Sequence, residues 1–180
     1  MEKYERINRE LVHKGAIIDY YQDTIRIPNG NIAKWDYIKH KGAAAVVAVK
    51  EDGKLLMVRQ YRNALDRETL EIPAGGLNGV DEPTDIAAAR ELEEEAGYTA
   101  GKLELLISIR TTVAFCDEKI DIYVATDLKR SKQHLDEDEY LDVETYTIEE
   151  LVQIVYDCKI QDGKTVAALL AYYNKYRQNN

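Results

Sequence analysis

The sequence predicts an α/β protein made of one main globular domain and a small β-rich appendage. The chain has 180 residues, of which 45% are hydrophobic and 32% charged, and this size and balance suit a single domain with a core of its own. Stretches with the alternation of β-strands fill the N-terminal part and recur later, whereas helical patterns lie in the middle and at the end of the chain. Together they predict strands and helices within one fold.

The N-terminal region predicts a small meander of strands. Residues 9–40 show β-rich alternation, interrupted by the turn signal Pro28-Asn29-Gly30-Asn31. A sheet of this size can hardly stand alone, so we expect it to pack on the main domain or on another subunit. Trp35 is the single tryptophan. Its residue type leaves two interpretations open, a core or interface aromatic and a platform on which a base stacks.

The next part of the chain predicts strands of the main domain. Ala43–Val49 is a run of small residues and valines typical of a buried strand. Asp52-Gly53 is a hairpin-turn signal that leads to a partner strand at residues 55–61. A short strand at residues 69–72 precedes the turn Pro73-Ala74-Gly75-Gly76, which can expose a backbone carbonyl to a metal.

Two arginines, Arg59 and Arg62, lie at the end of the partner strand. Arginines at such a place can simply be solvated. The guanidinium group is also the side chain best shaped to hold a phosphate through two hydrogen bonds. The residue types alone leave both interpretations open.

The most informative stretch, residues 76–98, predicts an acidic helix. It holds seven acidic residues against one base, Arg90, a local charge of 1 − 7 = −6. Pro83 fits the first helical turn and Gly97 fits the left-handed position just past the last turn. At about 100° per residue, two groups fall on different sides of this helix. They are the apolar Ile86, Ala89, Leu92 and Ala96, and the acidic Glu91, Glu94 and Glu95.

The acidic side of this helix predicts a cation site. Glu91, Glu94 and Glu95 lie three or four residues apart where they face one another, and like charges at those spacings on a helix repel. A solvated face would alternate acidic residues with lysine, which is absent from the stretch. Oxygen ligands of this kind suit Mg²⁺, which tends to keep waters for a substrate phosphate. The alternative is an acidic, solvent-exposed helix without a ligand.

The rest of the chain predicts three more strands and two helices. The strands are expected at residues 102–110, 120–125 and 140–146. The polar, acidic residues 133–139 predict a solvated loop. Thr147-Ile148-Glu149-Glu150 matches a capping box that opens a helix to about Tyr156. Thr165 can cap the last helix.

Composition excludes several classes of protein. A net charge of −9 and an isoelectric point near 4.9 argue against a nucleic-acid-binding surface. No apolar run is long enough for a membrane span, and the N-terminus lacks the pattern of a signal peptide. Two cysteines, Cys116 and Cys158, form no disulfide framework, so we expect a cytoplasmic protein. The histidines His13, His40 and His134 show no metal-ligand spacing.

The spacing within residues 76–98 resembles the Nudix box. Gly76 is followed after five residues by Glu82 and after seven more by Arg90-Glu91-Leu92-x-Glu94-Glu95-x-Gly97, with Tyr98 in the final apolar position. The strings IRIPNG, HKGAAAVVAV, MVRQYRN and LEIPAGG, and the Asp-Glu pair after the box, resemble the ADP-ribose pyrophosphatase branch of the Nudix hydrolases. The likeness covers roughly residues 10–150.

The resemblance implies a fold and an assembly. The fold is a Nudix-type α/β/α sandwich with a mixed β-sheet, plus a small N-terminal antiparallel β meander. The implied division is residues 1–41, the meander that forms a homodimer through its strands, and residues 42–180, the hydrolase domain.

The resemblance also implies roles for individual residues around a metal. Glu91 and Glu95, with Glu94 close by, and the carbonyl of Ala74 would coordinate Mg²⁺ or Mn²⁺. Arg90 would orient the glutamates. Glu118, or a box glutamate such as Glu94, would accept a proton during catalysis. Structural roles fall to Gly76, Glu82 and Gly97.

For the substrate, the resemblance implies contacts from Arg62 and Arg59 to the diphosphate and from Trp35 to an adenine. The reaction would be metal-dependent hydrolysis of ADP-ribose to AMP and ribose 5-phosphate. Members that hydrolyse ADP-ribose typically carry Pro-Gly where this chain has Val113-Ala114, and this changes the conformations open to the loop. Other nucleotide sugars such as GDP-mannose, dinucleotides, and a non-catalytic nucleotide-sensing module are the alternatives.

Overall fold

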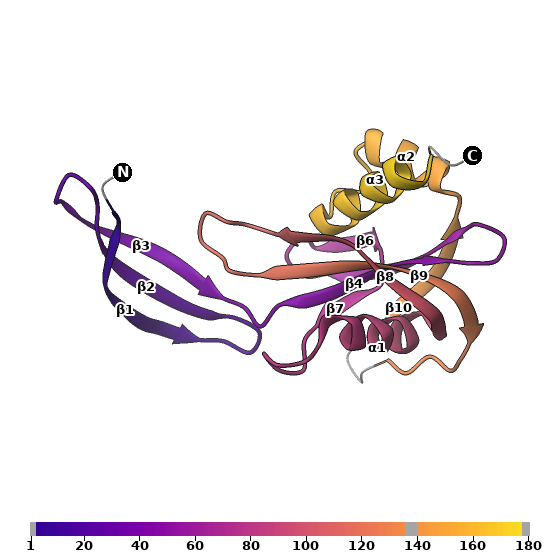
Figure 1. The fold of residues 1–180 in the computed structure, drawn as a ribbon, viewed down its shortest axis with the longest axis horizontal. Coiled ribbons are helices and arrows are strands. Elements are labelled where there is room, and N and C mark those ends of the chain that lie inside the picture. The colour runs from indigo at the N-terminus through magenta and orange to yellow at the C-terminus, as the bar shows by residue number, and fades with distance from the viewer. Residues whose placement is uncertain (1–2, 136–139, 178–180) are drawn as a thin grey trace. The chain divides into compact units, whose positions relative to one another are not determined.

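The computed structural model describes residues 3–135 and 140–177 (Figure 1). Residues 136–139 of the predicted acidic loop lie outside the described residues. The chain divides into two compact units, Met1–Gly42 with Arg110–Lys119, and Ala43–Ile109 with Ile120–Asn180. Each unit is described by itself.

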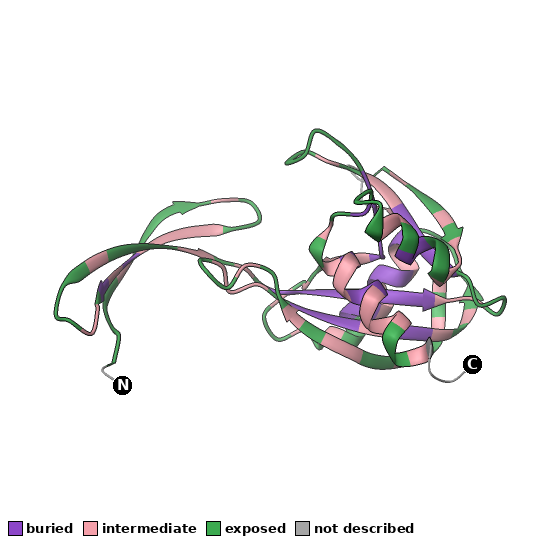
Figure 2. Ribbon diagram, turned by 90° about the horizontal axis from the view of Figure 1, so that it is seen from above, coloured by how far each residue is buried: buried purple, intermediate pink, exposed green. Residues whose placement is uncertain are grey.

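The smaller unit is a three-stranded antiparallel sheet. Its strands are β1 (Glu5–Lys14), β2 (Asp19–Arg26) and β3 (Ile32–Lys39), in that order. The separate antiparallel sheet was predicted. Both faces are largely exposed or half-buried (Figure 2), and Asp23 and Ile25 are the buried residues of its strands. Residues 110–119 join this unit, where Cys116 forms a parallel bridge with Ile38 beside the end of β3.

The larger unit is a mixed sheet between two layers of helices. Its main strand order is β10-β5-β4-β9-β8, with β6 on β5 and β7 on β4; β4 and β9 are parallel. The strands are β4 (Ala43–Val49), β5 (Leu55–Arg62), β6 (Arg67–Glu71), β7 (Ala74–Gly76), β8 (Tyr98–Arg110), β9 (Lys119–Arg130) and β10 (Leu141–Tyr146). Helix α1 (Thr84–Ala96) covers one face, and α2 (Ile148–Tyr156) and α3 (Gly163–Arg177) cover the other (Figure 1). This is the predicted α/β/α sandwich.

Strand β4 lies at the centre of the core. Ala45 and Val47 belong to the cluster that includes Leu151 of α2, whereas Val46 belongs to the cluster that includes Leu92 of α1. Because side chains alternate along a strand, each face of β4 packs against one helical layer. Burial on both faces explains why this strand is an uninterrupted apolar run.

The ends of the helices agree with the sequence analysis in two places and differ in two. Gly97 caps α1 in the left-handed conformation, with φ 69°, and Thr147 forms the complete capping box of α2. Pro83 is the N-cap of α1 and therefore precedes the first turn. Thr165 does not cap α3, because Asp162 accepts its N–H at 3.0 Å and α3 begins at Gly163.

The predicted apolar side of α1 is partly wrong. Ile86 is 57% exposed, while Ala87 and Ala88 are completely buried. The buried side also holds Glu91 and Glu95, at 7% and 3% exposure. The helix is therefore rotated so that two carboxylates face inward, which an amphipathic pattern does not anticipate.

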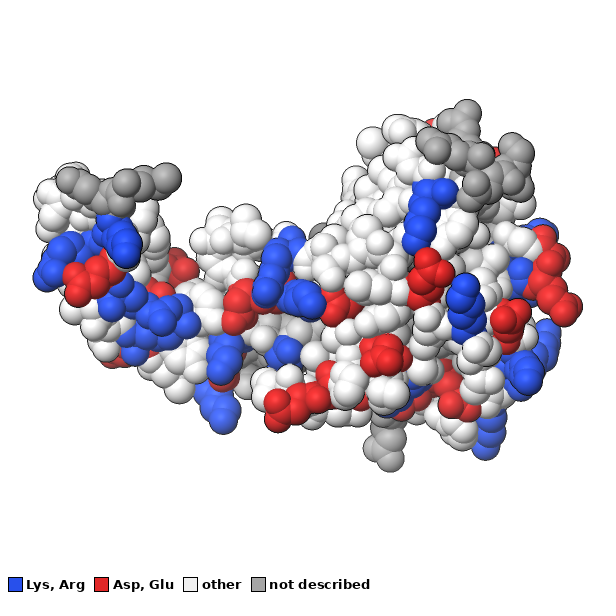
Figure 3. Space-filling view, viewed as in Figure 1, with Lys and Arg blue, Asp and Glu red and all other residues white. Residues whose placement is uncertain are grey.

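The surface carries both signs of charge, and basic side chains gather on the visible face of the three-stranded sheet (Figure 3). Within the part of the chain that the structure describes, none of the helices combines the length and apolar character needed to cross a membrane.

Candidate active site

The acidic cluster is built where strand β7 meets helix α1. Oε2 of Glu95 accepts the backbone N–H of Ala74 at 3.0 Å. One turn earlier, the carboxylate of Glu91 lies over Gly75, where an added Cβ would sit 2.2 Å from the Glu91 carboxyl carbon. Glycine at this position is therefore what allows the carboxylate to approach the strand so closely.

Arg90 connects several members of the cluster through hydrogen bonds and ion pairs. Its Nη1 donates to Glu91 Oε1 at 2.6 Å and to Glu94 Oε2 at 2.8 Å, and its Nη2 donates to the carbonyl of Gly76 at 3.0 Å. Glu82 lies 3.3 Å from its Nε. Burial lowers the pKa of Arg90, but these carboxylates outweigh burial and raise it overall.

Glu82 braces the loop before α1. Its Oε2 accepts the backbone N–H of Asn78 at 2.6 Å, and this bond and Arg90 hold the pKa of Glu82 below its usual value. The structure thus brings together the predicted box residues of α1, the turn and the loop.

The acidic cluster is a candidate site for a divalent ion. In residues 3–135 and 140–177, no group of three or more His, Cys, Asp or Glu side chains is arranged as a ready metal site. The carboxylates of Glu91 and Glu94 are turned toward Arg90, and that of Glu95 toward the Ala74 N–H. The chemistry of these side chains still fits a hard cation, because carboxylate oxygens from successive turns of α1 gather beside the backbone of β7.

The predicted diphosphate-binding arginines both hold carboxylates. Arg62 donates from Nε and Nη2 to Glu71, each at 2.7 Å. Arg59 donates to Glu144 at 2.5 and 3.2 Å. Each guanidinium is thereby fixed in orientation by a bidentate pair.

Glu71 lies in a buried cluster of charge that the sequence analysis missed. It is 1% exposed and also accepts from Lys164 of α3 and from the hydroxyl of Thr69. Burial raises its pKa, but Arg62, Lys164 and Thr69 outweigh burial and lower the pKa to about 2. The partners of Glu71 come from β5, β6 and α3, so no local sequence pattern predicts this cluster.

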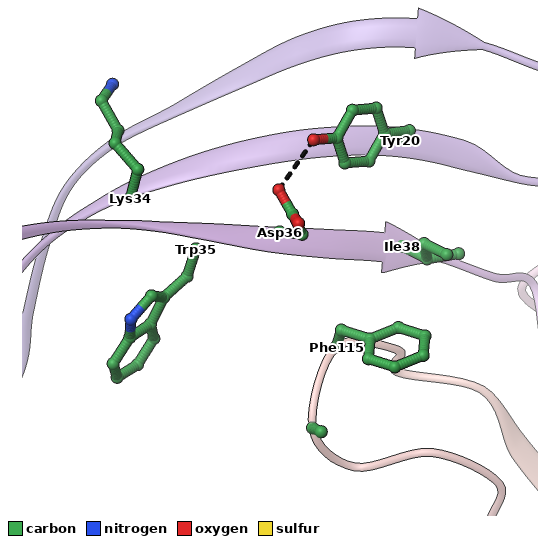
Figure 4. A pocket seen from close by; sticks show the side chains of 7 residues that line it. Tyr20, Lys34, Trp35, Asp36, Ile38 and Phe115 are labelled. Atoms are coloured by element: carbon green, nitrogen blue, oxygen red, sulfur yellow. Dashed lines mark hydrogen bonds between the residues drawn. The ribbon is translucent and has the colours of Figure 1, made fainter.

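Trp35 and Glu118 belong to the smaller unit. Trp35 lies on β3, is 48% exposed, and lines a cavity of about 660 Å³ (Figure 4). The other lining residues are Tyr20, Lys34, Asp36, Ile38, Ala114 and Phe115. Tyr20 of β2 donates to Asp36 of the neighbouring strand β3 at 2.7 Å, and Phe115 comes from the loop that also bears Glu118 (Figure 4).

The sequence analysis missed the residues around Glu118. Thr111 donates to its Oε2 at 2.7 Å, and Nδ1 of His40 lies 3.3 Å from its Oε1. The sequence analysis finds no metal-ligand spacing for His40 and gives it no role at the site. The only available signal was its place in HKGAAAVVAV, which does not reveal a neighbour so far away in sequence.

The fold and the box geometry define a Nudix enzyme. The NUDIX domain profile matches residues 39–169, so the chain belongs to the Nudix family. It is 41% identical over 165 residues to an ADP-ribose pyrophosphatase of Bacillus subtilis (strain 168), covering 91% of this chain and 89% of the relative. It is 40% identical to a methanol dehydrogenase activator of Bacillus methanolicus, with the same coverage.

A solved structure shares the fold. The crystal structure of an ADP compounds hydrolase superposes with a TM-score of 0.88 at 22% identity, covering 100% of this chain and 97% of that one. The chain is thus a Nudix pyrophosphohydrolase that acts on a nucleoside diphosphate compound.

Proposed function

We propose that this enzyme hydrolyses ADP-ribose to AMP and ribose 5-phosphate with a divalent metal ion, Mg²⁺ or Mn²⁺. The observation that carries the proposal is the pair of buried carboxylates, Glu91 and Glu95, one helical turn apart against β7. The substrate follows from the likeness to the Bacillus subtilis pyrophosphatase.

The acidic cluster would hold the metal. Glu91 and Glu95, with Glu94 and the carbonyl of Ala74, are the proposed ligands, and Arg90 keeps the glutamates in place. When bound, a divalent ion neutralises phosphate oxygens and lowers the pKa of a bound water.

The proposed reaction cleaves one P–O bond of the diphosphate bridge. Water attacks a phosphorus atom, its proton passes to a carboxylate, and the other phosphate leaves with the bridging oxygen. Glu118 is the proposed base, with a box glutamate such as Glu94 as the alternative. Arg62 and Arg59, already oriented by their carboxylate partners, would contact the diphosphate.

The cavity beside Trp35 is the proposed binding place for the adenine ring of the substrate. Its aromatic lining, Trp35 and Phe115, suits stacking of a purine, and Lys34 adds a positive charge. Residues 3–42 carry eight Lys and Arg against five Asp and Glu, a net charge of 8 − 5 = +3, in a chain that is acidic overall. This local excess favours an anionic ligand.

The smaller unit is also the proposed dimer-forming part. Large apolar side chains are exposed on it, namely Tyr4, Ile7, Leu11, Val12, Ile17, Ile18, Ile32 and Trp35. Exposed apolar groups in this number mark an interaction surface. We infer that a second copy covers it, with residues 1–41 as the dimer-forming part and residues 42–180 as the hydrolase domain, and we place the enzyme in the cytoplasm.

A substrate panel tests the proposal. ADP-ribose, ADP-glucose, GDP-mannose, NADH, FAD and a diadenosine polyphosphate are incubated with the full chain and Mg²⁺, and products are separated by chromatography. We expect AMP and ribose 5-phosphate from ADP-ribose at the highest rate. Faster cleavage of another compound would overturn the substrate, and no cleavage with any divalent metal would favour the nucleotide-sensing alternative.

A further inference from the structure

Residues 110–119 are fixed along the end of strand β3. The N–H of Ile38 donates to the carbonyl of Phe115 at 2.6 Å, and the N–H of Asp117 donates to the carbonyl of Ile38 at 3.2 Å. The guanidinium of Arg110 donates to the carbonyl of Asp117 at 2.5 Å. The backbone immediately before Glu118 is therefore held on both sides.

The side chain of Asp117 adds to this attachment. Its Oδ2 accepts from the hydroxyl of Tyr37, and its Oδ1 accepts the backbone N–H of His40 at 2.8 Å. Both oxygens of this carboxylate are engaged with the end of β3. Asp117 therefore fixes the loop to the strand.

Tyr37 is itself held in place by Arg9 of strand β1. The guanidinium carbon of Arg9 lies 3.5 Å from the centre of the Tyr37 ring, and Arg9 forms a bidentate pair with the buried Asp23 at 2.6 and 2.7 Å. Burial and the bond to Asp117 raise the pKa of Tyr37, so its hydroxyl stays protonated and donates at neutral pH. A chain of contacts thus runs from β2 through β1 and β3 to the loop.

The carboxylate of Glu118 has its own partners. Thr111 donates to Oε2 at 2.7 Å, and Nδ1 of His40 lies 3.3 Å from Oε1. The same nitrogen accepts the N–H of Gly42 at 3.0 Å, and a ring nitrogen that accepts a hydrogen bond carries no hydrogen to give to Glu118. Thr111 is therefore the side-chain donor that fixes this carboxylate.

We propose that Thr111 and Tyr37 are positioning residues for Glu118. Thr111 holds the carboxylate directly, and Tyr37 holds the loop through Asp117. This inference rests on the proposed function, in which Glu118 accepts the proton of the attacking water. A general base must lie within hydrogen-bond reach of that proton, and a displacement of about 1 Å can cost on the order of a hundredfold in rate.

Two single-hydroxyl variants of the full chain, Tyr37→Phe and Thr111→Val, test the proposal with ADP-ribose and Mg²⁺. We expect kcat to fall roughly tenfold, the effect of losing a hydrogen bond to a charged group, while KM changes less than about twofold. Tyr21→Phe and Thr99→Val are the matched controls, one a neighbouring tyrosine and the other an exposed threonine on β8. Thr111→Ser restores the hydroxyl and should restore kcat.

The same variants are then made in a Glu118→Gln background. If the hydroxyls act through Glu118, they lower the residual rate no further, because coupled residues are not additive. A further tenfold loss in that background, or unchanged kcat in both single variants, would overturn the inference.

The outcomes also separate this inference from the proposed function. If the wild type cleaves ADP-ribose and Glu118→Gln is fully active, then Glu118 is not the base and the positioning roles are refuted. The proposed substrate is unaffected by that outcome. If ADP-ribose is not cleaved, the substrate proposal fails and the variants are measured on the compound cleaved fastest. If nothing is cleaved, both proposals fall.

Discussion

The backbone N–H of Ala74 donates a hydrogen bond to Oε2 of Glu95 at 3.0 Å. This bond joins the strand that offers a proposed carbonyl ligand to the helix that offers a proposed carboxylate ligand. It also orients a side chain that is 3% exposed. The two proposed ligand groups, the carbonyl of Ala74 and the carboxylate of Glu95, are therefore placed together before any ion binds.

Replacing Glu95 by glutamine should abolish turnover and leave the fold intact. The amide keeps the shape and can still accept from Ala74, but it loses the charge that binds a cation. Changes in residues that merely support metal ligands cost about 10–100-fold, so we expect at least a hundredfold loss here. Steady-state rates with Mg²⁺ and the thermal unfolding midpoint are measured together. Glu93→Gln, on the same helix but away from the cluster, is the control, and full activity of Glu95→Gln would refute the ligand assignment.

Gly75→Ala should lower the catalytic rate strongly and the free energy of unfolding only modestly. The new Cβ would lie 2.2 Å from the carboxyl carbon of Glu91, so the end of that flexible side chain must move. Overpacking of this kind costs roughly 1–3 kcal/mol. Gly79→Ala, where an added Cβ meets nothing within 4 Å, is the control. Rates and denaturant unfolding are compared, and an unchanged rate would show that the position of Glu91 is unimportant.

The buried Glu71 should make stability depend on pH. Its pKa falls from 4.5 to about 2 in the folded state, so its contribution is present above pH 4.5 and is lost as the pH falls toward 2. By linkage this amounts to about 3 kcal/mol. Urea unfolding between pH 2 and 7 should show a weaker dependence for Glu71→Gln than for wild type. Glu68→Gln, an exposed neighbour, should follow the wild-type curve.

Trp35→Ala should raise KM for ADP-ribose more than it lowers kcat. Stacking of a base on an aromatic ring contributes roughly 1–3 kcal/mol, so a rise of about fivefold or more is expected. Because Trp35 is the only tryptophan, intrinsic fluorescence reports its surroundings directly. ADP-ribose added without metal should change this emission. Tyr156→Ala, an exposed aromatic on α2, is the control, and an unchanged KM would remove Trp35 from the substrate site.

The exposed apolar residues of the smaller unit should support a dimer. Light scattering of the full chain should give twice the monomer mass, and a variant combining Ile7→Asp with Leu11→Asp should shift toward monomer, because charge is costly in a buried interface. Tyr140→Asp, at an exposed position of the larger unit, should leave the mass unchanged. A monomeric wild type would contradict the assembly.

Local patterns were sufficient for most elements. The bounds of β4 agree with the predicted strand, and α2 begins at its capping box. Strand β8 was predicted too short, since it begins at Tyr98, directly after Gly97. Thr99 and Gly101 interrupt the alternation there, and pairing with β9 decides the outcome instead.

The box residues could be located from their spacing, but their partners could not. Glu71 and Lys164 lie 93 residues apart, and Tyr37 and Asp117 lie 80 apart. Such contacts depend on how sheets and helices pack, which periodicity does not encode. The inward position of Glu91 was likewise unexpected, because burying a carboxylate is unfavourable unless a partner such as Arg90 is present.

The grouping of residues 110–119 with residues 1–42 has a consequence for recombination between related chains. The smaller unit is assembled from two separate parts of the chain, so a substitution in one part can remove the partner of a residue in the other. After an exchange of residues 1–42 alone, the bond between positions 37 and 117 would persist only if the new segment also carried a tyrosine at position 37. A chimera that takes both segments from the same parent should therefore keep these contacts.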